Sequence, residues 1–531
     1  MSETLSALIA AHDGAAPALG APGRDWMDFA GLRALSGDVA GALHGAGIGR
    51  GDRVAIVLPN GPEMAAAFVT VAQVATTCPL NPAYKQDEFA FYLEDLKAKA
   101  VILMEGEAGP AHAAATGLGL PVIRLRSGEG PAGRFTLHAE GSAGDADTSA
   151  PGPEDMDISA PSPEDVDISA PGPEDVALIL HTSGTTSRPK IVPLLQSNLA
   201  ASARNIGASL DLSPADRCLN VMPLFHIHGL IAAVSASLAA GASVCCAPGF
   251  DALKFFGWMK ETRPNWYTAV PTMHQAILAR AGRNAETIAE VPLRFLRSSS
   301  ASLPGPVMEQ LAETFGAPVI EGYGMTEATH QMASNPLPPR AQKPGSVGVE
   351  AGPLVCIAHE VEDRLVGSGD VGEVVISGPN VTPGYEGNPE ANAKSFFEAE
   401  GRRWFRTGDQ GTFDDEGYLT LTGRLKEIIN RGGEKVSPLE VDGVLSAHPA
   451  VAQVVTFALP HPKLGEEVAA AVVLREGAEA DEAAIRAFAS ERLAGFKVPR
   501  KVVILDEIPK GATGKLQRIG LAEKLGLVEG A

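Results

Sequence analysis

The stretch HTSGTTSRPK, from His181 to Lys190, is the most informative part of the sequence. It follows the apolar run Ala177–Leu180, which has the length of a buried strand. Its hydroxyl side chains and glycine supply O–H and N–H donors, and Arg188 and Lys190 add positive charge at its end. Donors and cations in this arrangement suit a polyphosphate group. The stretch therefore predicts a phosphate-binding loop, although its spacing is not that of a Walker A motif.

On both sides of this loop, helix and strand patterns alternate. Before it, apolar residues at helical spacing from Leu32 to Leu43 precede the strand-like run Val54–Leu58. The glycines between these two segments predict a tight turn, because they precede the strand, whereas those of a dinucleotide-binding motif follow it. The alternation predicts a layered α/β body. Its later predicted elements are the strands Val319–Ile320 and Val374–Ile376 and the helices Asp251–Lys260 and Val307–Phe315.

After Gly423 the pattern changes to a compact α+β set. The expected elements are the strands Val451–Leu459, Val468–Leu474 and Lys501–Leu505 and the helix Asp481–Leu493. A small C-terminal domain is the simplest interpretation of this change.

Length and charge exclude several classes of protein. The chain has 531 residues, well above the roughly 100–200 of one domain, and its formal net charge is −21. Nucleic-acid backbones and anionic membranes attract clustered Lys and Arg, so the acidic balance disfavours both as partners. The 5 cysteines have no CxxC spacing, which argues against a zinc cluster or a disulfide framework.

The N-terminal segment has no basic region, and no apolar run reaches the roughly 18 residues of a membrane span. We therefore expect a cytoplasmic location.

Residues 149–178 contain a decapeptide in tandem: SAPGPEDMDI, SAPSPEDVDI and SAPGPEDVAL. Proline and acidic residues recur at fixed places, which predicts an extended acidic insert over 149–168, whereas the third copy leads into the strand before the phosphate loop. A role of the insert in binding a partner remains an alternative.

Four further motifs follow in order: EGYGMTE (321–327), RTGD (406–409), GRLKE (423–427) and PKGATGKLQR (509–518). With the first loop, they resemble the adenylate-forming superfamily of acyl-CoA synthetases, peptide-synthetase adenylation domains and firefly-type luciferases. The resemblance covers residues 25–525 outside the insert. It implies an α/β fold with a large multi-subdomain N-terminal body over 1–423, a hinge at 424–426 and a small mobile α+β lid over 427–531.

The resemblance also implies a two-step reaction. A carboxylate attacks the α-phosphate of ATP to give an acyl-AMP and pyrophosphate, with Mg²⁺ neutralising charge, and the thiol of coenzyme A then displaces AMP. Glycine is usual in the superfamily where Ser187 and Ile191 stand, so these two residues put the mobility of the loop in doubt.

Residue roles follow from the same matching. The phosphates would be held by Thr182, Ser183, Gly184, Thr185, Thr186 and Lys190, and the rest of the nucleotide by Ser300, Ala301, Ser302, Glu321, Gly322, Tyr323, Gly324, Asp409 and Arg424. Within that set Tyr323 would stack on adenine, and Asp409, assisted by Arg424, would accept from the ribose hydroxyls. The expected catalytic residues are Lys515, which would bridge the carboxylate and the α-phosphate, Thr326, which would contact the α-phosphate, Glu327, which would ligate Mg²⁺, and His228. Lys426 matches the hinge, and Gly432 and Gly433 would meet the pantetheine arm of coenzyme A.

Four segments should build the acid pocket: Met222–Gly229, Trp266–His274, Arg297–Ser302 and Thr329–His330. They offer His228, Ser298, Ser299 and His330 where a pocket for a fatty chain would be apolar. Such groups suit a very small acid with a second carboxylate, and these segments resemble those of the oxalate:CoA ligases of plants and fungi.

Some assignments stay open at this stage. His274 could line the coenzyme A tunnel or cap a helix, and Arg297 could pair with the substrate or with a structural acid. A metal site at His226 and His228 has no evident third ligand.

The alternative functions are a CoA ligase for another short acid such as malonate, an enzyme that loads a separate carrier protein, and a catalytically silent nucleotide-binding protein. A monomer and a weak homodimer are both compatible with the sequence.

Overall fold

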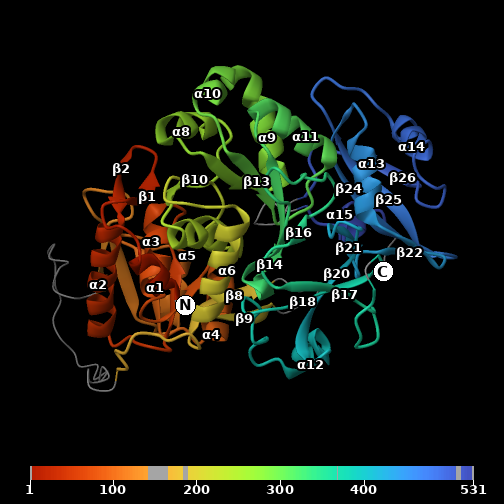
Figure 1. The fold of residues 1–531 in the computed structure, drawn as a ribbon. Coiled ribbons are helices and arrows are strands. Elements are labelled where there is room, and N and C mark those ends of the chain that lie inside the picture. The colour runs from red at the N-terminus through yellow and green to blue at the C-terminus, as the bar shows by residue number, and fades with distance from the viewer. Residues whose placement is uncertain (1–2, 141–165, 183–188, 368, 510–515, 529–531) are drawn as a thin grey trace. The chain divides into compact units, whose positions relative to one another are not determined.

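The structure is a computed structural model that describes residues 3–140, 166–182, 189–367, 369–509 and 516–528. The chain divides into two compact units. The first unit contains Met1–Thr268, Met325–Gln331 and Pro379–Asn392, and the second contains Ala269–Gly324, Met332–Gly378 and Ala393–Ala531. Figure 1 labels the elements along the chain.

The first unit contains a seven-stranded sheet in the order β7-β6-β5-β3-β4-β8-β9. Its inner strands are parallel, and the edge strands β7 and β9 run antiparallel to their neighbours. The strands are β3 (Arg53–Val57), β4 (Thr76–Pro79), β5 (Ala100–Met104), β6 (Val122–Ser127), β7 (Phe135–Ala139), β8 (Val176–Thr182) and β9 (Lys190–Leu195). The β8–β9 connection leaves the carboxyl edge of the parallel strands, which is the edge where open α/β sheets bind ligands.

Helices pack against this sheet because each one has a continuous apolar face. In α2 the buried residues from Phe29 to Leu43 recur at helical spacing, and Asp28 accepts a hydrogen bond from Gly31 N as the N-cap. The helices of this region are α1 (Leu5–Ala10), α2 (Phe29–Gly45), α3 (Pro62–Val71), α4 (Gln86–Leu96), α5 (Pro110–Gly117) and α6 (Gln196–Ser209).

A second set of strands in the first unit pairs in the order β12-β10-β11-β1-β2, with all but β2 parallel. These strands are β1 (Pro17–Ala21), β2 (Arg24–Asp28), β10 (Arg217–Asn220), β11 (Ser243–Cys246) and β12 (Trp266–Ala269). The π-helix η2 (His228–Ser235), α7 (Ala236–Ala239) and α8 (Phe255–Thr262) follow the chain here. The helix predicted over Asp251–Lys260 begins four residues late, because Asp251 Oδ1 accepts from Leu253 N and Lys254 N and holds a separate turn.

The second unit begins with an α/β segment in which β13 and β14 are parallel and β15 and β16 antiparallel. Its elements are α9 (Pro271–Ala281), η3 (Gly282–Asn284), α10 (Ala285–Glu290), β13 (Phe295–Ser299), α11 (Gly305–Phe315), β14 (Val319–Met325), β15 (His330–Ser334) and β16 (Val349–Glu350). The short turn η4 (Thr326–Ala328), the first two residues of β15 and the start of α12 (Pro389–Ser395) belong to the first unit.

An antiparallel sheet follows in the order β17-β18-β20-β19, with β21 paired to β20. Its strands are β17 (Leu354–Ala358), β18 (Gly372–Ser377), β19 (Phe396–Ala399), β20 (Arg402–Phe413) and β21 (Leu419–Arg424).

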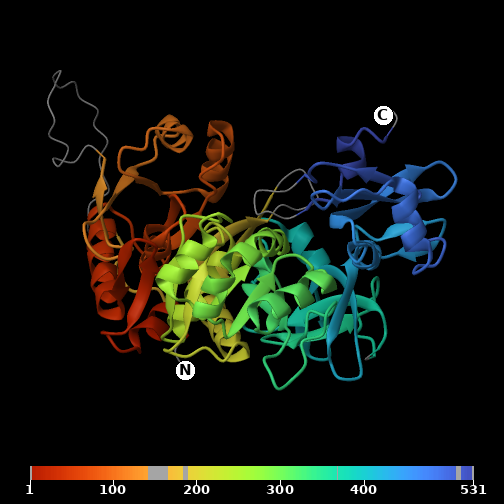
Figure 2. The ribbon, with the colours of Figure 1, turned by 90° about the horizontal axis from the view of Figure 1, so that it is seen from above.

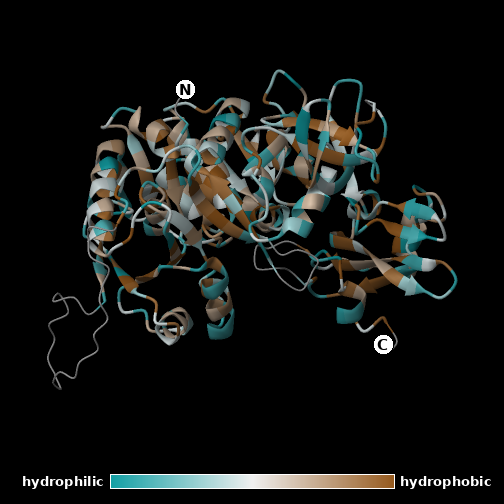
Figure 3. Ribbon diagram, turned by 90° about the horizontal axis from the view of Figure 1, so that it is seen from below, coloured by the Kyte–Doolittle hydropathy of each residue, from teal (hydrophilic) through white to brown (hydrophobic). Residues whose placement is uncertain are grey.

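The C-terminal segment forms a small α+β domain with its own sheet, drawn in blue in Figure 2. Buried residues of α13 and α14 cover one face of this sheet, and those of α15 cover the other. The elements are β22 (Ile429–Arg431), β23 (Glu434–Val436), α13 (Pro438–Ser446), β24 (Val451–His461), β25 (Gly465–Leu474), α14 (Glu482–Ser490), β26 (Lys501–Ile504) and α15 (Leu521–Lys524). The brown colour of much of β24 and β25 in Figure 3 shows how apolar these central strands are.

The α/β body and the α+β C-terminal domain predicted from the sequence are thus both present, and most predicted strands match to within a few residues. Residues 149–165 of the predicted acidic insert lie outside the described residues, but its last three residues, 166–168, are described. Arg50 N donates to Asp167 O at 2.8 Å, so this end of the insert is bound to the turn before β3. Among the helices of the described ranges, none is both long and apolar enough to span a membrane.

Candidate active site

The predicted phosphate loop is the connection of an antiparallel hairpin. Thr182 at the end of β8 pairs directly with Lys190 at the start of β9, and His181 pairs with Ile191. Both ends of the loop are therefore fixed by strand pairing. Ser183, Gly184, Thr185 and Thr186 lie outside the described residues, and their roles stay predictions.

Lys190 and Glu327 both contact Tyr385, one at its ring and the other at its hydroxyl group. The Lys190 ammonium lies 4.2 Å from the centre of the Tyr385 ring, and Tyr385 Oη donates to Glu327 Oε1 at 2.7 Å. Glu327 is 6% exposed and Tyr385 5%. The structure therefore places a predicted phosphate ligand, Lys190, and the predicted magnesium ligand, Glu327, on either side of one buried tyrosine.

Backbone contacts hold this cluster in place. Thr382 N donates to Glu327 O at 2.7 Å. Glu327 follows Thr326 in the short turn η4. Asn380 Nδ2 donates to Ala328 O at 2.8 Å, and Thr329 Oγ1 donates to Asn380 O at 2.7 Å. The segment that carries Tyr385 is thus bound directly to the turn that carries Thr326 and Glu327.

Two predicted substrate residues, His228 and His330, lie side by side in the first unit. Their ring centroids are 5.2 Å apart, and both side chains are buried. His228 Nε2 is 2.6 Å from Thr268 Oγ1, a hydrogen bond that fixes the orientation of the imidazole. His228 begins η2, and π-helical segments recur at functional sites in proteins. His226 is not part of this pair: its Nδ1 accepts from His228 N at 3.3 Å.

A small cavity of about 40 Å³ lies beside the phosphate hairpin, with Tyr84, Tyr92, His181 and Phe225 in its lining. His181 Nε2 is 3.0 Å from Asp95 Oδ2. Burial lowers the pKa of His181, and the hydrogen bond to Asp95 opposes that shift. The cavity has room for about one water molecule, so we assign it no substrate.

The other two predicted substrate residues, Ser298 and Ser299, end β13 in the second unit and are fully buried. Ser299 Oγ donates to Gly322 O at 2.6 Å, which ties β13 to β14. Ser298 Oγ has no hydrogen-bond partner among the described residues. A buried hydroxyl in this state is available to a bound ligand, which favours Ser298 over Ser299 as a substrate contact.

The structure decides part of what the sequence left open for the neighbouring residues. His274 lies inside α9, where its Nε2 contacts Arg297 O at 3.2 Å, so the helix-cap alternative is wrong. Burial lowers the pKa of His274 to about 4. The Arg297 guanidinium is itself buried and packs against Gly322, where a Cβ atom would lie 2.8 Å from Nη2.

The turn Ser300–Ser302 is anchored by a buried acid. Glu321 Oε1 accepts from Leu303 N at 2.9 Å, and burial raises the pKa of Glu321 to about 8. Ser300 has a φ of 73°, a conformation uncommon outside glycine. The Glu321 side chain therefore holds the turn in place, a role that the sequence did not suggest. Ala301 and Ser302 are exposed there, and Gly322 and Gly324 lie in β14.

Tyr323, Asp409 and Arg424 form one cluster in the second unit. Tyr323 Oη donates to Asp409 Oδ2, and Arg424 Nε lies 3.3 Å from Asp409 Oδ1. Asp409 and Arg424 are paired residues of β20 and β21. Burial raises the pKa of Tyr323 well above its ordinary value, so the phenol remains a donor. The three residues predicted to bind adenosine are thus brought together.

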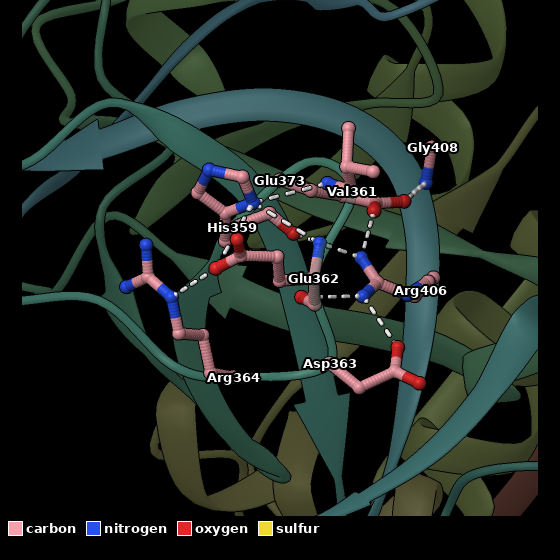
Figure 4. A network of polar contacts seen from close by, with 8 residues as sticks. All are labelled: His359, Val361, Glu362, Asp363, Arg364, Glu373, Arg406 and Gly408. Atoms are coloured by element: carbon pink, nitrogen blue, oxygen red, sulfur yellow. Dashed lines mark hydrogen bonds and ion pairs between the residues drawn. The ribbon is translucent and has the colours of Figure 1, made fainter.

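A polar network joins β18 to β20 just before Asp409, and Figure 4 shows its members Glu373, Arg406 and Gly408. Glu373 Oε1 accepts from Gly408 N at 3.0 Å, and Arg406 Nη1 donates to Glu373 Oε2 at 2.6 Å. Arg406 Nη2 also donates to Asp363 Oδ1 at 2.9 Å. Burial raises the pKa of Glu373, and Arg406 opposes that shift.

The predicted hinge and pantetheine residues lie in turns. Lys426 is exposed in the turn between β21 and β22. Gly432 and Gly433, with φ of 63° and 100°, connect β22 to β23 as a two-residue hairpin turn, which needs positive φ at both positions. Lys515 lies outside the described residues. Three residues later, Arg518 Nη2 pairs with Asp442 Oδ2 at 2.6 Å, which anchors the chain after the motif.

Sequence reasoning missed Thr268, Glu373 and Tyr385. Thr268 lies within a segment already assigned to the acid pocket, so its hydroxyl was a usable signal. Tyr385 and Glu373 lie outside every motif, and only the fold brings them to Glu327 and Gly408.

Comparison with protein families gives two matches. The AMP-binding enzyme model matches residues 8–386, and the AMP-binding enzyme C-terminal domain model matches residues 440–515.

Comparison with curated proteins finds relatives that cover most of the chain. An oxalate–CoA ligase of Arabidopsis thaliana is 46% identical over 483 residues, which are 89% of this chain and 88% of that protein. An oxalate–CoA ligase of Saccharomyces cerevisiae is 41% identical over 497 residues, 91% of this chain and 88% of that protein. A sulfoacetate–CoA ligase of Cupriavidus necator is 34% identical over 528 residues, 98% and 97% respectively.

Among solved structures, ATP-bound MatB from Rhodopseudomonas palustris superposes with a TM-score of 0.84 at 28% identity and covers 99% of both chains. This fold and the two family matches agree with the five ordered motifs of the sequence. The chain belongs to the family of AMP-binding enzymes and has the adenylate-forming enzyme fold, with a large N-terminal body and a small C-terminal domain.

Proposed function

We propose that the chain is an AMP-forming acid–CoA ligase whose acid is oxalate. The reaction would be oxalate + ATP + CoA = oxalyl-CoA + AMP + diphosphate. The observation that carries this proposal is the identity of 46% and 41%, over nearly the whole chain, to proteins named oxalate–CoA ligase. The buried polar groups of the predicted acid pocket support it.

For adenosine, Tyr323, Asp409 and Arg424 supply the expected groups. Asp409 carries acceptor oxygens for the ribose hydroxyls, and Arg424 keeps positive charge beside the carboxylate. Tyr323 offers a ring next to that carboxylate, as stacking on adenine requires.

For the phosphates, Thr182 and Lys190 stand at the two ends of the hairpin loop, and Thr326 precedes Glu327. The buried Glu327 carboxylate fits Mg²⁺, a hard cation that prefers oxygen ligands. When bound, Mg²⁺ would neutralise phosphate charge. Lys190 adds a positive charge 4.2 Å from the centre of the Tyr385 ring, and the hydroxyl group of Tyr385 donates to Glu327.

For the acid, His228 and His330 provide imidazole donors, and Ser298 provides a hydroxyl. Oxalate has no methylene group to bury, so polar groups on all sides suit it better than apolar walls. We propose the His228–His330 pair of the first unit as ligands of the acid, and the role that the resemblance gives to Ser298 and Ser299 stays a prediction.

In the first step an oxalate oxygen would attack the α-phosphorus and diphosphate would leave. In the second, the CoA thiolate would attack the acyl carbon and AMP would leave. We propose that Lys515 stabilises charge in the first step only, with the C-terminal domain rotating about Lys426 between steps to bring Gly432 and Gly433 to pantetheine. A cytoplasmic location, and a monomer or weak homodimer, remain our expectations.

The test is CoA-dependent AMP release by purified protein with oxalate, malonate, sulfoacetate, acetate and hexanoate. Oxalate should give the highest kcat/KM, and Ser298→Ala should raise the KM for oxalate more than it alters the KM for ATP. Comparable turnover of malonate or sulfoacetate would replace oxalate by a broader class of short dianions, an alternative that the sulfoacetate–CoA ligase relative favours. AMP release without CoA-thioester formation would favour a carrier protein as acceptor.

A further inference from the structure

Strand β20 contains a bulge that carries Asp409. Glu373 pairs with Gln410 and Val375 pairs with Arg406, so two steps along β18 correspond to four along β20. Thr407, Gly408 and Asp409 therefore lie opposite Val374 alone, which is two residues more than regular pairing would place there. Gly408 has a φ of 76°, a left-handed conformation that glycine adopts without steric cost. Bulges of this kind redirect side chains next to active sites.

A bulge loses ladder hydrogen bonds, and here side chains replace them. Thr407 Oγ1 donates to Val374 O at 2.8 Å and accepts from Asp409 N at 3.1 Å. Gly408 N donates to Glu373 Oε1 at 3.0 Å. The acceptor for the N–H group of Gly408, the central residue of the bulge, is therefore the Glu373 carboxylate of the neighbouring strand β18.

Glu373 is 5% exposed, so its charge needs compensation. Arg406, the residue before the bulge, donates to Glu373 Oε2 at 2.6 Å and to the carbonyl oxygens of His359 and Glu362. Figure 4 shows the guanidinium between these groups, with Glu373 reaching across to Gly408. Glu373 thus bonds both the residue before the bulge, Arg406, and the central residue of the bulge, Gly408.

We infer that Glu373 is a positioning residue for ribose recognition: it fixes the bulge so that the Asp409 carboxylate faces the ribose hydroxyls of ATP. The inference rests on the ribose role proposed above for Asp409. Glu373 itself contacts no substrate in this account, and its effect should be seen only with nucleotides that carry those hydroxyls.

The experiment measures the Kd of ATP and of 2′,3′-dideoxy-ATP by isothermal titration calorimetry for the full-length chain and three variants. Glu373→Ala should weaken ATP binding about tenfold, in the range expected for a lost hydrogen bond to a charged group, and leave the Kd of the dideoxy nucleotide at the wild-type value. Glu362→Gln is the matched control, because the Glu362 side chain is exposed and bonds Arg364 instead of the bulge. It should bind both nucleotides like the wild type.

Equal weakening of both nucleotides by Glu373→Ala, or no weakening of either, overturns the inference. Should Glu373→Ala fail to fold, the same comparison is decided with Glu373→Gln, which keeps an acceptor for Gly408 N but loses the ion pair to Arg406. Asp409→Ala separates the two proposals. If Asp409→Ala raises the Kd of both nucleotides equally, the ribose role of Asp409 is wrong. If Asp409→Ala raises only the Kd of ATP, whereas Glu373→Ala raises both or neither, the ribose role stands and only the inference about Glu373 is wrong.

Discussion

Glu321 is a carboxylic acid that the fold keeps away from water, at 2% exposure. Burial raises its pKa from an ordinary value of 4.5 to about 8. The folded state therefore binds a proton that the unfolded state releases between these two values, and stability falls as pH rises through that window. Below pH 4.5 both states are protonated and the penalty is absent.

Glu321→Gln should remove this pH dependence, because the amide keeps an acceptor for Leu303 N and cannot ionise. The unfolding free energy of the variant minus that of the wild type should rise from pH 5 to pH 8 by up to about 4 kcal/mol, since one pKa unit corresponds to about 1.4 kcal/mol. Urea denaturation across this range measures the difference. A constant difference would mean that Glu321 is ionised in the folded protein.

Tyr385 should tune the magnesium requirement through Glu327. Tyr385→Phe removes the hydrogen bond to Glu327 Oε1, and the loss of such a supporting bond should raise the Mg²⁺ concentration for half-maximal ATP binding about tenfold. Tyr418→Phe is a matched control: Tyr418 Oη donates to Ala341 O, and Lys343 lies over its ring at 4.1 Å. The same shift in both variants would refute a specific role of Tyr385.

Among the single residues of the site, the sequence predicted those that belong to contiguous motifs. Tyr323, Glu327, Asp409 and Lys190 were found this way, and the structure places them in two polar clusters. Thr268, Glu373 and Tyr385 were not found, because their importance depends on contacts with residues far away in the chain. The sequence treated Ser298 and Ser299 alike, because it could not show that the Ser299 hydroxyl donates to Gly322 O in β14.

Among the elements, the π-helix η2 controls the position of His228. Its second residue, Gly229, has no room for a side chain, since a Cβ atom there would lie 2.4 Å from Pro223 O. Gly229→Ala must therefore displace the start of the helix. We expect it to destabilise the protein by about 1–3 kcal/mol and to raise the KM for the acid.

The control for that variant is Gly207→Ala in α6, where the nearest atom to the new Cβ would be 3.9 Å away. It should be neutral or stabilising, because alanine favours a helix over glycine. Thermal unfolding and acid KM are measured for both variants. Wild-type values for Gly229→Ala would show that η2 does not determine the position of His228.

Predictions of elements succeeded where apolar periodicity was strong, as in α2, β24 and β25. They failed at the start of α8, because the Asp251 turn competes with the helix. The bulge of β20 was also missed, because its cause is the pairing with β18.

For the whole molecule, the decapeptide repeat offers a test of how the insert is attached. Within the described residues of the insert, Asp167 O at the end of the second copy accepts a hydrogen bond from Arg50 N. Deletion of the first copy, 149–158, should change neither activity nor melting temperature. Deletion of both copies, 149–168, removes this contact and should lower the melting temperature. Equal behaviour of the two deletions would contradict this view of the attachment.

The two-domain organisation followed from the change of pattern after Gly423 and from the order of the motifs, and both family matches agree with it. The sequence could not give the division of the chain into compact units, since the second unit is assembled from three separate segments.

In the proposed reaction, oxalate is activated when one of its oxygen atoms bonds to the α-phosphorus of ATP. This step is tested by mass spectrometry of the AMP formed from ¹⁸O-labelled oxalate, ATP, Mg²⁺ and CoA. Attack by a carboxylate oxygen predicts that each AMP carries one ¹⁸O atom and that oxalyl-CoA forms in equal amount. Unlabelled AMP, or the label in diphosphate or inorganic phosphate, would contradict the account.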